Sequence, residues 1–244
     1  MVAINCRGVI FQDIQAIIFD KDGTLEDSQE FLRNLGQKRC RLIDAKIPGI
    51  GEPLLMAFGI DGNNINPIGL MAVGSRRENE IAAAAYIAET GRDWLESLTI
   101  VKEAFAEADE ILPKSTPNYL FTGSLAVLKY LSQAGIKLGI LSADNTTAVQ
   151  NFVRYHQLND YIQLEMGVDD IRSKPDPELF LQACQKLGVK PATALMVGDS
   201  PTDIEMGRKA EAAGCIGICW GKPEANHLQT ADVAIAKLEE IKVL

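Results

Sequence analysis

Two carboxylates stand close together directly after a run of large apolar residues. The run Ile17–Phe19 leads into Asp20, and Asp22 follows two positions later. The apolar neighbours favour the interior, so Asp20 is expected to be drawn inside the protein, where an unpaired charge is costly. Two more carboxylates, Asp199 and Asp203, increase this cost if they converge on the same place. Carboxylate oxygens suit Mg²⁺, so the sequence predicts a divalent cation that compensates them.

Further polar residues follow other apolar runs. Ser142 and Asp144 come at the end of one run, Asp199 lies at the end of another, and Lys174 occurs in the segment SKPDPELF. Each residue type also has an ordinary role. Asp144 and Thr202 are expected first of all to cap the helices that follow them, because both types accept hydrogen bonds from the first helical turn. Lys174 taken alone is an ordinary solvated lysine.

Short apolar runs alternate with helical patterns from residue 123 onward. This alternation predicts an α/β fold, a doubly wound, Rossmann-like parallel sheet with helices on both faces. The predicted strands are 15–20, 136–142, 161–167, 192–200 and 215–221, with a short edge run at 232–235. The predicted helices are 124–134, 146–157, 177–187 and 202–213. Ligands of such sheets bind beyond the carboxyl ends of the strands, which is where the polar residues are expected to meet.

A long segment between the first strand and the rest does not follow this alternation. Helical patterns cover 27–45, 75–89 and 93–112, around a stretch rich in Gly, Pro and Asn at 47–69 and before a linker at 113–118. Asp27 and Ser28, with Glu30, are expected to cap the first of these helices, and Ser75 with Glu78 forms a capping box. The sequence predicts an all-helical cap domain over 26–118, inserted into a core domain made of 1–25 and 119–244.

Composition narrows the possible functions. The chain has 244 residues, a net charge of −9, and 47% hydrophobic residues, so it can bury a large core. An acidic chain binds nucleic acid and anionic membranes poorly, and we expect neither partner. The longest apolar stretch is too short to span a bilayer, and the first residues do not resemble a signal peptide, so a cytoplasmic protein is expected. The five cysteines match no zinc spacing and are expected to be free thiols.

The motifs together resemble those of the haloacid dehalogenase superfamily, in its phosphoglycolate phosphatase-like branch. The segment DKDGTLEDS is similar to the first signature of that superfamily. Ser142, Lys174 in SKPDPELF, and VGDSPTD at 197–203 are similar to the other three, in the same order. The resemblance covers essentially the whole chain and implies a Rossmann-like core with a cap inserted after the first motif.

The resemblance also implies a role for each motif residue. Asp20 is then the nucleophile, which forms an aspartyl-phosphate, and Asp22 is the general acid and base. Mg²⁺ is held by Asp20, by the backbone carbonyl of Asp22 and by Asp199, and Asp203 supports the site by ordering a metal-bound water or Lys174. The remaining residues are expected to bind the phosphate oxygens, partly through backbone groups: Gly23, Thr24, Ser142, Ala143 and Lys174.

Three readings of function stay open at this point. The first is a Mg²⁺-dependent phosphatase of a small phosphorylated metabolite, and the second is a sugar phosphomutase, which uses the same four motifs. The third, a non-catalytic phosphate-binding module, has no need of both a nucleophile and an acid. A dehalogenase is disfavoured because that branch lacks the second aspartate. Contacts to the leaving group are expected from the cap, and a monomer or weak homo-oligomer is expected. Arginines that are candidates for these contacts are Arg33, Arg39, Arg41, Arg76 and Arg77.

Overall fold

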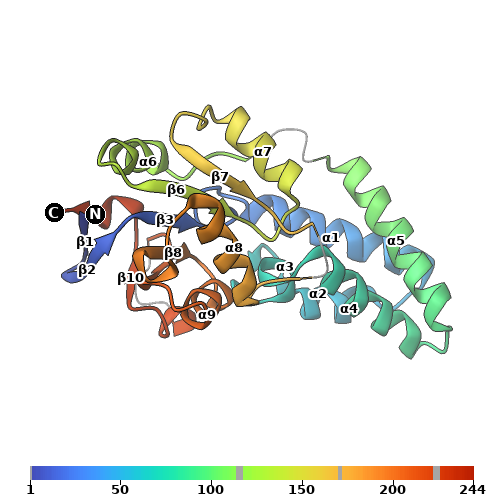
Figure 1. Ribbon diagram of the computed structural model, residues 1–244. Coiled ribbons are helices and arrows are strands. Elements are labelled where there is room, and N and C mark those ends of the chain that lie inside the picture. The colour runs from blue at the N-terminus through green and yellow to red at the C-terminus, as the bar shows by residue number, and fades with distance from the viewer. Residues whose placement is uncertain (1, 114–117, 170–171, 222–225) are drawn as a thin grey trace. The chain divides into compact units, whose positions relative to one another are not determined.

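The computed structural model describes residues 2–113, 118–169, 172–221 and 226–244. The chain divides into two compact units (Figure 1). One unit comprises Met1–Asp27 and Pro117–Leu244, and the other comprises Ser28–Thr116. Glu26, which the predicted boundaries place in the cap, therefore belongs to the same unit as the sheet.

The first unit is built on a six-stranded parallel sheet, which confirms the predicted fold class. The strand order is β10-β9-β8-β3-β6-β7, and all neighbouring pairs are parallel. The strands are β3 (Ala16–Phe19), β6 (Lys137–Leu141), β7 (Ile162–Met166), β8 (Ala194–Gly198), β9 (Gly214–Ile218) and β10 (Val233–Ile235). Chain order reverses around β3, so the carboxyl ends of β3, β6 and β8 lie next to one another, as ligand sites in such sheets require.

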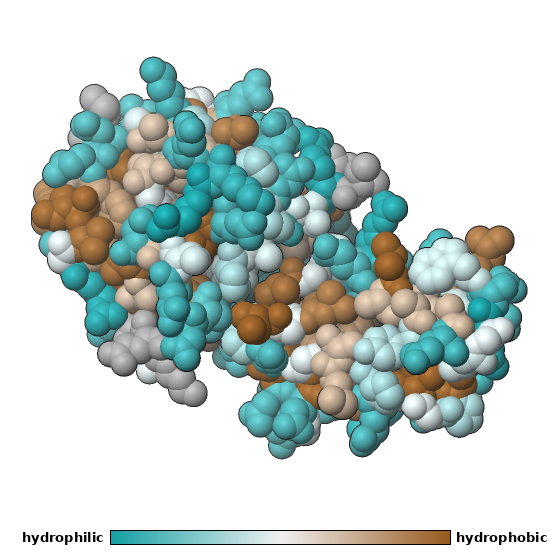
Figure 2. Space-filling view, turned by 90° about the horizontal axis from the view of Figure 1, so that it is seen from below, coloured by the Kyte–Doolittle hydropathy of each residue, from teal (hydrophilic) through white to brown (hydrophobic). Residues whose placement is uncertain are grey.

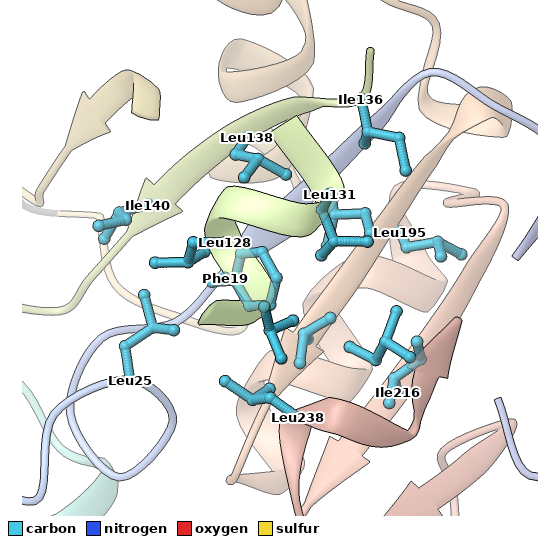
Figure 3. Close-up of a cluster of buried hydrophobic side chains, with 14 of the residues drawn as sticks. Phe19, Leu25, Leu128, Leu131, Ile136, Leu138, Ile140, Leu195, Ile216 and Leu238 are labelled. Atoms are coloured by element: carbon cyan, nitrogen blue, oxygen red, sulfur yellow. The ribbon is translucent and has the colours of Figure 1, made fainter. Parts of the chain in front are cut away.

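Helices cover both faces of this sheet (Figure 1). One face carries α6 (Ser124–Gln133) and α7 (Thr146–Tyr155), and the other carries α8 (Pro177–Leu187) and α9 (Pro201–Lys209). Short 3₁₀ turns are η1 (Pro191–Thr193), η2 (Asn226–Leu228) and η3 (Leu238–Glu240). Strand β3 is buried on both sides, because Ile17 and Phe19 join one cluster while Ala16 and Ile18 join the other. Figure 3 shows Phe19 packed near Leu128 of α6.

A second sheet joins the two ends of the chain, and the sequence did not predict it. Its order is β11-β1-β2, all antiparallel, with β1 (Val2–Cys6), β2 (Val9–Ile14) and β11 (Ile241–Val243). Arg7 and Gly8 turn the chain between β1 and β2, both with positive φ. The pairing of β1 with β11 joins segments more than 200 residues apart, which no local pattern indicates.

The inserted unit is mainly helical, but the prediction that it is all-helical is wrong. Its helices are α1 (Gln29–Lys46), α2 (Gly51–Phe58), α3 (Leu70–Val73), α4 (Arg76–Glu89) and α5 (Trp94–Ile111). A β-hairpin with two residues in each strand, β4 (Ile60–Asp61) and β5 (Asn64–Ile65), lies within the stretch rich in Gly, Pro and Asn. The hairpin turn passes through Gly62, whose φ is positive, so the turn residues here bend the chain into two short strands.

Helix starts in this unit test the predicted caps. The capping box of Ser75 and Glu78 is confirmed, with both of its backbone contacts present. The predicted cap of the first helix is wrong: Ser28 occupies the N-cap position, but its side chain accepts no capping hydrogen bond. Its hydroxyl is buried and has no hydrogen-bond partner in the described part of the chain. Most of the predicted linker, 114–117, lies outside the described residues.

Of the five candidate arginines, Arg33 donates to the carbonyl oxygen of Asn63 (3.0 Å), and two others share one carboxylate partner within the inserted unit. Asp109 on α5 pairs with Arg39 on α1 at 3.3 Å and with Arg76 at the start of α4. The Arg39 guanidinium also lies 4.2 Å from the ring centre of Phe105. Burial lowers the pKa of Arg39, while the carboxylate of Asp109 opposes that shift. These arginines tie three helices together, and Arg77, which is exposed, has no such contact recorded in the described part of the unit.

Hydrophilic side chains cover most of the face seen in Figure 2, and hydrophobic residues form smaller groups there. Among the described residues, no helix combines the length and hydrophobicity needed to cross a membrane.

Candidate active site

The nucleophile candidate Asp20 lies directly after β3 and is almost completely buried. Its backbone N–H donates to the carbonyl of Val197 in β8 (2.8 Å), so the sheet fixes its position. Nζ of Lys174 donates to Oδ1 of Asp20 at 2.5 Å. Burial raises the pKa of Asp20 to about 7, with Lys174 opposing and the carboxylate of Asp203 reinforcing the rise. Lys174 therefore holds one oxygen of Asp20, and burial has the larger effect on the pKa of this carboxyl group.

Three carboxylates lie together in this part of the unit. Oxygens of Asp20, Asp199 and Asp203 lie within 4.8 Å of one another. Lys174 also donates to Asp203 at 2.7 Å. One ammonium against three carboxylates leaves two negative charges, and burial followed by repulsion from Asp20 raises the pKa of Asp199 well above its ordinary value. This donor set fits a small divalent cation, because all donors are oxygen and the charge balances.

Asp203 has a different place in this cluster from Asp20 and Asp199. Its Oδ1 accepts from Lys174, and its Oδ2 accepts from the backbone N–H (3.2 Å) and hydroxyl (2.6 Å) of Ser200. Ser200 in turn caps α9, with Asp203 at the third helical position, so the predicted cap at Thr202 is wrong. Both oxygens of Asp203 already have partners. This geometry suits a residue that holds Lys174 better than a direct metal ligand.

Two glycines, one in the turn after β3 and one at the end of β8, let the carboxylates approach the backbone. A Cβ atom at Gly23 would lie 2.0 Å from Oδ2 of Asp199, and one at Gly198 would lie 2.4 Å from Cβ of Asp203. Gly23 also has a φ of +81°, which only glycine adopts readily. The turn that contains Gly23 and Thr24 therefore lies directly against the carboxylate of Asp199. Any side chain at Gly23 would displace it.

Ser142 lies at the carboxyl end of β6 and is buried. Its N–H donates to the carbonyl of Met166 in β7 (3.0 Å), and its hydroxyl oxygen accepts from the N–H of Asp144 (3.1 Å). Ala143 is exposed between them. Asp144 does not cap α7 as predicted, because Asn145 caps it by accepting from Ala148 (2.8 Å). The side chain of Asp144 instead pairs with a lysine of the first motif.

That lysine, Lys21, was not identified from the sequence. It is almost fully buried, and its ammonium contacts the carboxylates of Asp22, Glu26 (2.6 Å) and Asp144 (3.1 Å). The carboxylate of Asp22 is therefore held by Lys21 and lies outside the group formed by Asp20, Asp199 and Asp203. A signal for Lys21 was present, because it follows the same buried run as Asp20 and needs a counter-ion for the same reason.

Mg²⁺ is expected to raise the melting temperature of EDTA-treated protein, and to do so more at pH 8 than at pH 6. A carboxyl group with a pKa of about 7, Asp20, is protonated at the lower pH, and the cation must then displace the proton. At about 100-fold excess over its dissociation constant, binding stabilises the fold by about 2.7 kcal/mol, or roughly 5–10 °C. Differential scanning fluorimetry measures this. A shift that is equal at both pH values, or unchanged in Asp199→Asn, would contradict the assignment.

Comparisons with known proteins indicate the family of this chain. The family model described as haloacid dehalogenase-like hydrolase matches residues 14–211. A phosphoglycolate phosphatase of Shigella boydii is 27% identical over 241 residues, with 95% of this chain and 92% of that protein covered. Among solved structures, a predicted phosphoglycolate phosphatase from Haemophilus somnus has a TM-score of 0.67 at 21% identity and covers 93% and 96% of the two chains. A β-phosphoglucomutase from Clostridium difficile has a TM-score of 0.62 at 20% identity and covers 94% and 93%.

These matches confirm the predicted family resemblance and the prediction that the protein is an enzyme of the hydrolase class. The curated relative is itself a phosphatase, as the predicted enzyme class requires. The likeness to the solved structures concerns the fold alone, since these identities are low. The family model spans most of the chain, from the end of β2 to the residues after α9, and includes all four motifs. The chain therefore belongs to the haloacid dehalogenase-like hydrolase family.

Proposed function

We propose that this protein is a Mg²⁺-dependent phosphatase that hydrolyses a small phosphorylated metabolite through an aspartyl-phosphate on Asp20. The observation that carries the proposal is the contact of Lys174 with both Asp20 and Asp203, beside Asp199, at adjacent strand ends. In this arrangement the ammonium of Lys174 fixes the carboxylate nucleophile Asp20, and the three carboxylates together carry more negative charge than Lys174 can balance. The excess fits a divalent metal ion.

The geometry supports different roles for the two carboxylate oxygens of Asp20. Lys174 holds Oδ1, so Oδ2 is the oxygen that attacks phosphorus. Burial opposes the charge of Lys174, but the carboxylates of Asp20 and Asp203 outweigh it and raise its pKa, which keeps the ammonium charged. Mg²⁺, when bound, reduces the repulsion between the carboxylate and the phosphate dianion. Asp20 and Asp199 would hold it, with the backbone carbonyl of Asp22.

Other residues bind the phosphate and move the proton. Ser142 and Lys174 stabilise the non-bridging oxygens, over which charge spreads in the transition state. The backbone N–H of Ala143 adds a donor. The N–H groups of Gly23 and Thr24, which the sequence predicted to do the same, donate instead to the carbonyl oxygens of Glu26 (2.9 Å) and Lys21 (3.3 Å). Asp22 protonates the leaving alkoxide and then accepts a proton from the water that hydrolyses the aspartyl-phosphate.

The relatives indicate which substrates to test first. The name of the curated relatives makes 2-phosphoglycolate the first candidate, and sugar phosphates follow from the mutase among the solved structures. A phosphomutase remains the alternative, because it would use the same residues up to the aspartyl-phosphate. The two differ only in the acceptor, which is water in one case and a second hydroxyl group in the other.

Phosphate release from a panel of phosphorylated metabolites tests the proposal. We expect release from 2-phosphoglycolate or another small ester with Mg²⁺ and none with excess EDTA. Ca²⁺ is expected to support the reaction poorly, because its larger and looser coordination disturbs in-line transfer. Isomerisation of a sugar phosphate without release would favour the mutase. Binding without turnover of any ester, including p-nitrophenyl phosphate, would favour a non-catalytic module. Full activity in EDTA, with no metal by elemental analysis, would rule out the metal.

A further inference from the structure

Two lysines of the first unit are buried among the described residues, and they contact different carboxylates. Lys174 contacts Asp20 and Asp203, whereas Lys21 contacts Asp22, Glu26 and Asp144. The contacts of Lys21 with Asp22 and Glu26 are hydrogen bonds, and its contact with Asp144 is an ion pair. The proposed function accounts for Lys174 but gives no role to Lys21. Adjacent residues of the first motif thus enter two separate charge networks.

A further set of contacts, which does not involve Asp22, holds Lys21 through Glu26. Glu26, its partner at 2.6 Å, is fully buried. The other oxygen of Glu26 accepts from the backbone N–H (2.7 Å) and the side-chain amide (3.3 Å) of Asn118. The carbonyl oxygen of Asn118 lies 3.0 Å from Nε2 of His156, the residue directly after α7. These contacts link Glu26 to Asn118 and, through it, to His156. Because Glu26 is held in this way, the ammonium group of Lys21 is held as well.

The backbone of Lys21 controls the same turn as its side chain. Its carbonyl oxygen accepts from the N–H groups of Thr24 (3.3 Å), Leu25 (2.9 Å) and Glu26 (2.9 Å). The N–H of Gly23 donates to the carbonyl of Glu26 (2.9 Å), which closes the turn. Asp22 lies inside this closed turn. One residue therefore sets both the backbone path around Asp22 and the position of its carboxylate.

We propose that Lys21 is a positioning residue for Asp22, with Glu26 and Asp144 as the anchors that fix Lys21. The inference deepens the proposed function and rests on it, because the task of Asp22 is to exchange a proton with the leaving oxygen. A proton donor must lie within hydrogen-bond reach of that oxygen, and a displacement of about 1 Å costs about 10²-fold in rate. Asp144 further links Asp22 to the loop that carries Ser142.

A simpler role would make Lys21 only a counter-ion for the buried Glu26. Lys21→Met alone cannot separate the two roles, because it leaves a buried unpaired carboxylate and can unfold the protein. The double variant Lys21→Met/Glu26→Gln removes both charges and nearly keeps both shapes. Glu26→Gln also keeps an oxygen that can accept from Asn118. If Lys21 serves only to neutralise Glu26, the double variant must recover normal turnover.

The experiment compares two esters in the double variant with Mg²⁺. With the best alkyl phosphate, which has a poor leaving group, we expect kcat to fall about 10²-fold with KM within twofold. The pre-steady-state burst of p-nitrophenol should fall less than tenfold, because that leaving group needs little protonation. A matched control is Lys209→Met/Glu205→Gln, the same changes in an exposed pair on α9, which should leave both rates unchanged. Normal turnover in the double variant, or equal losses with both esters, would overturn the inference.

A crystal structure of the double variant gives a readout that does not depend on activity. We expect the carboxyl group of Asp22 to move by about 1 Å or more, or to lose a single defined position, while Asp20 keeps its contact with Lys174. An unmoved Asp22 carboxyl group would overturn the inference, even in a fully folded protein. If the unmodified enzyme releases no phosphate from any ester, the proposed function fails. The crystal structure then still decides whether Lys21 positions Asp22.

Discussion

Asp20→Asn is expected to lower kcat for phosphate release by at least about 10⁴-fold with every ester, including p-nitrophenyl phosphate. The amide cannot form the aspartyl-phosphate, and the quality of the leaving group cannot compensate for a missing nucleophile. Acid-quenched enzyme incubated with labelled substrate should carry no covalent phosphate. Steady-state kinetics and the quench experiment check both parts.

The folded state of this variant is expected to be at least as stable as that of the original protein in EDTA at pH 8. A carboxyl group whose pKa burial raises from 3.8 to about 7 destabilises the fold progressively as the pH rises between these two values. The penalty is fully present at pH 8, and the amide removes it. Asp13→Asn is a matched control, because Asp13 is exposed in β2 and its positive φ suits asparagine. Retained covalent labelling in Asp20→Asn would show that another residue is the nucleophile.

Asp22→Asn is expected to lower kcat by about 10²–10⁴-fold for alkyl phosphates while phosphorylation of Asp20 remains possible. The amide cannot protonate an alkoxide, but p-nitrophenolate leaves without that help. The burst of p-nitrophenol should therefore persist at a moderately reduced rate, followed by slow turnover, because the same residue activates the hydrolytic water. Labelled aspartyl-phosphate should accumulate in this variant.

Rapid-quench kinetics with both ester types test this division of labour. An equal reduction of the burst for both esters would contradict it, as would the absence of any accumulated phosphoenzyme. Asp160→Asn provides a control for the same chemical change at an exposed position of the same unit. The two aspartates of the first motif thus have opposite expected signatures, since one change prevents labelling and the other prolongs it.

The sequence by itself determined the sheet and the residues at its strand ends. Strands such as Ala16–Phe19 are short, fully apolar and followed at once by a polar residue, a pattern that needs no distant contact to be recognised. Asp20, Ser142 and Asp199 follow such runs directly, so their approximate convergence followed from the rule that parallel strands end at one edge. The capping box of Ser75 was predictable for the same local reason.

Tertiary structure alone decided how the charges are paired. Lys21 and Glu26 are five positions apart in a polar segment, and only the closed turn and Asn118, 92 positions from Glu26, make them a buried pair. Strand order likewise decided that Lys174 contacts Asp203 as well as Asp20, and the chain ends form a sheet across more than 200 residues. Hydrophobic periodicity predicts whether a side chain faces the core or the solvent. An ion pair depends on which charged residue lies next to it in the folded protein. That partner comes from a distant part of the chain, where the local sequence carries no record of it.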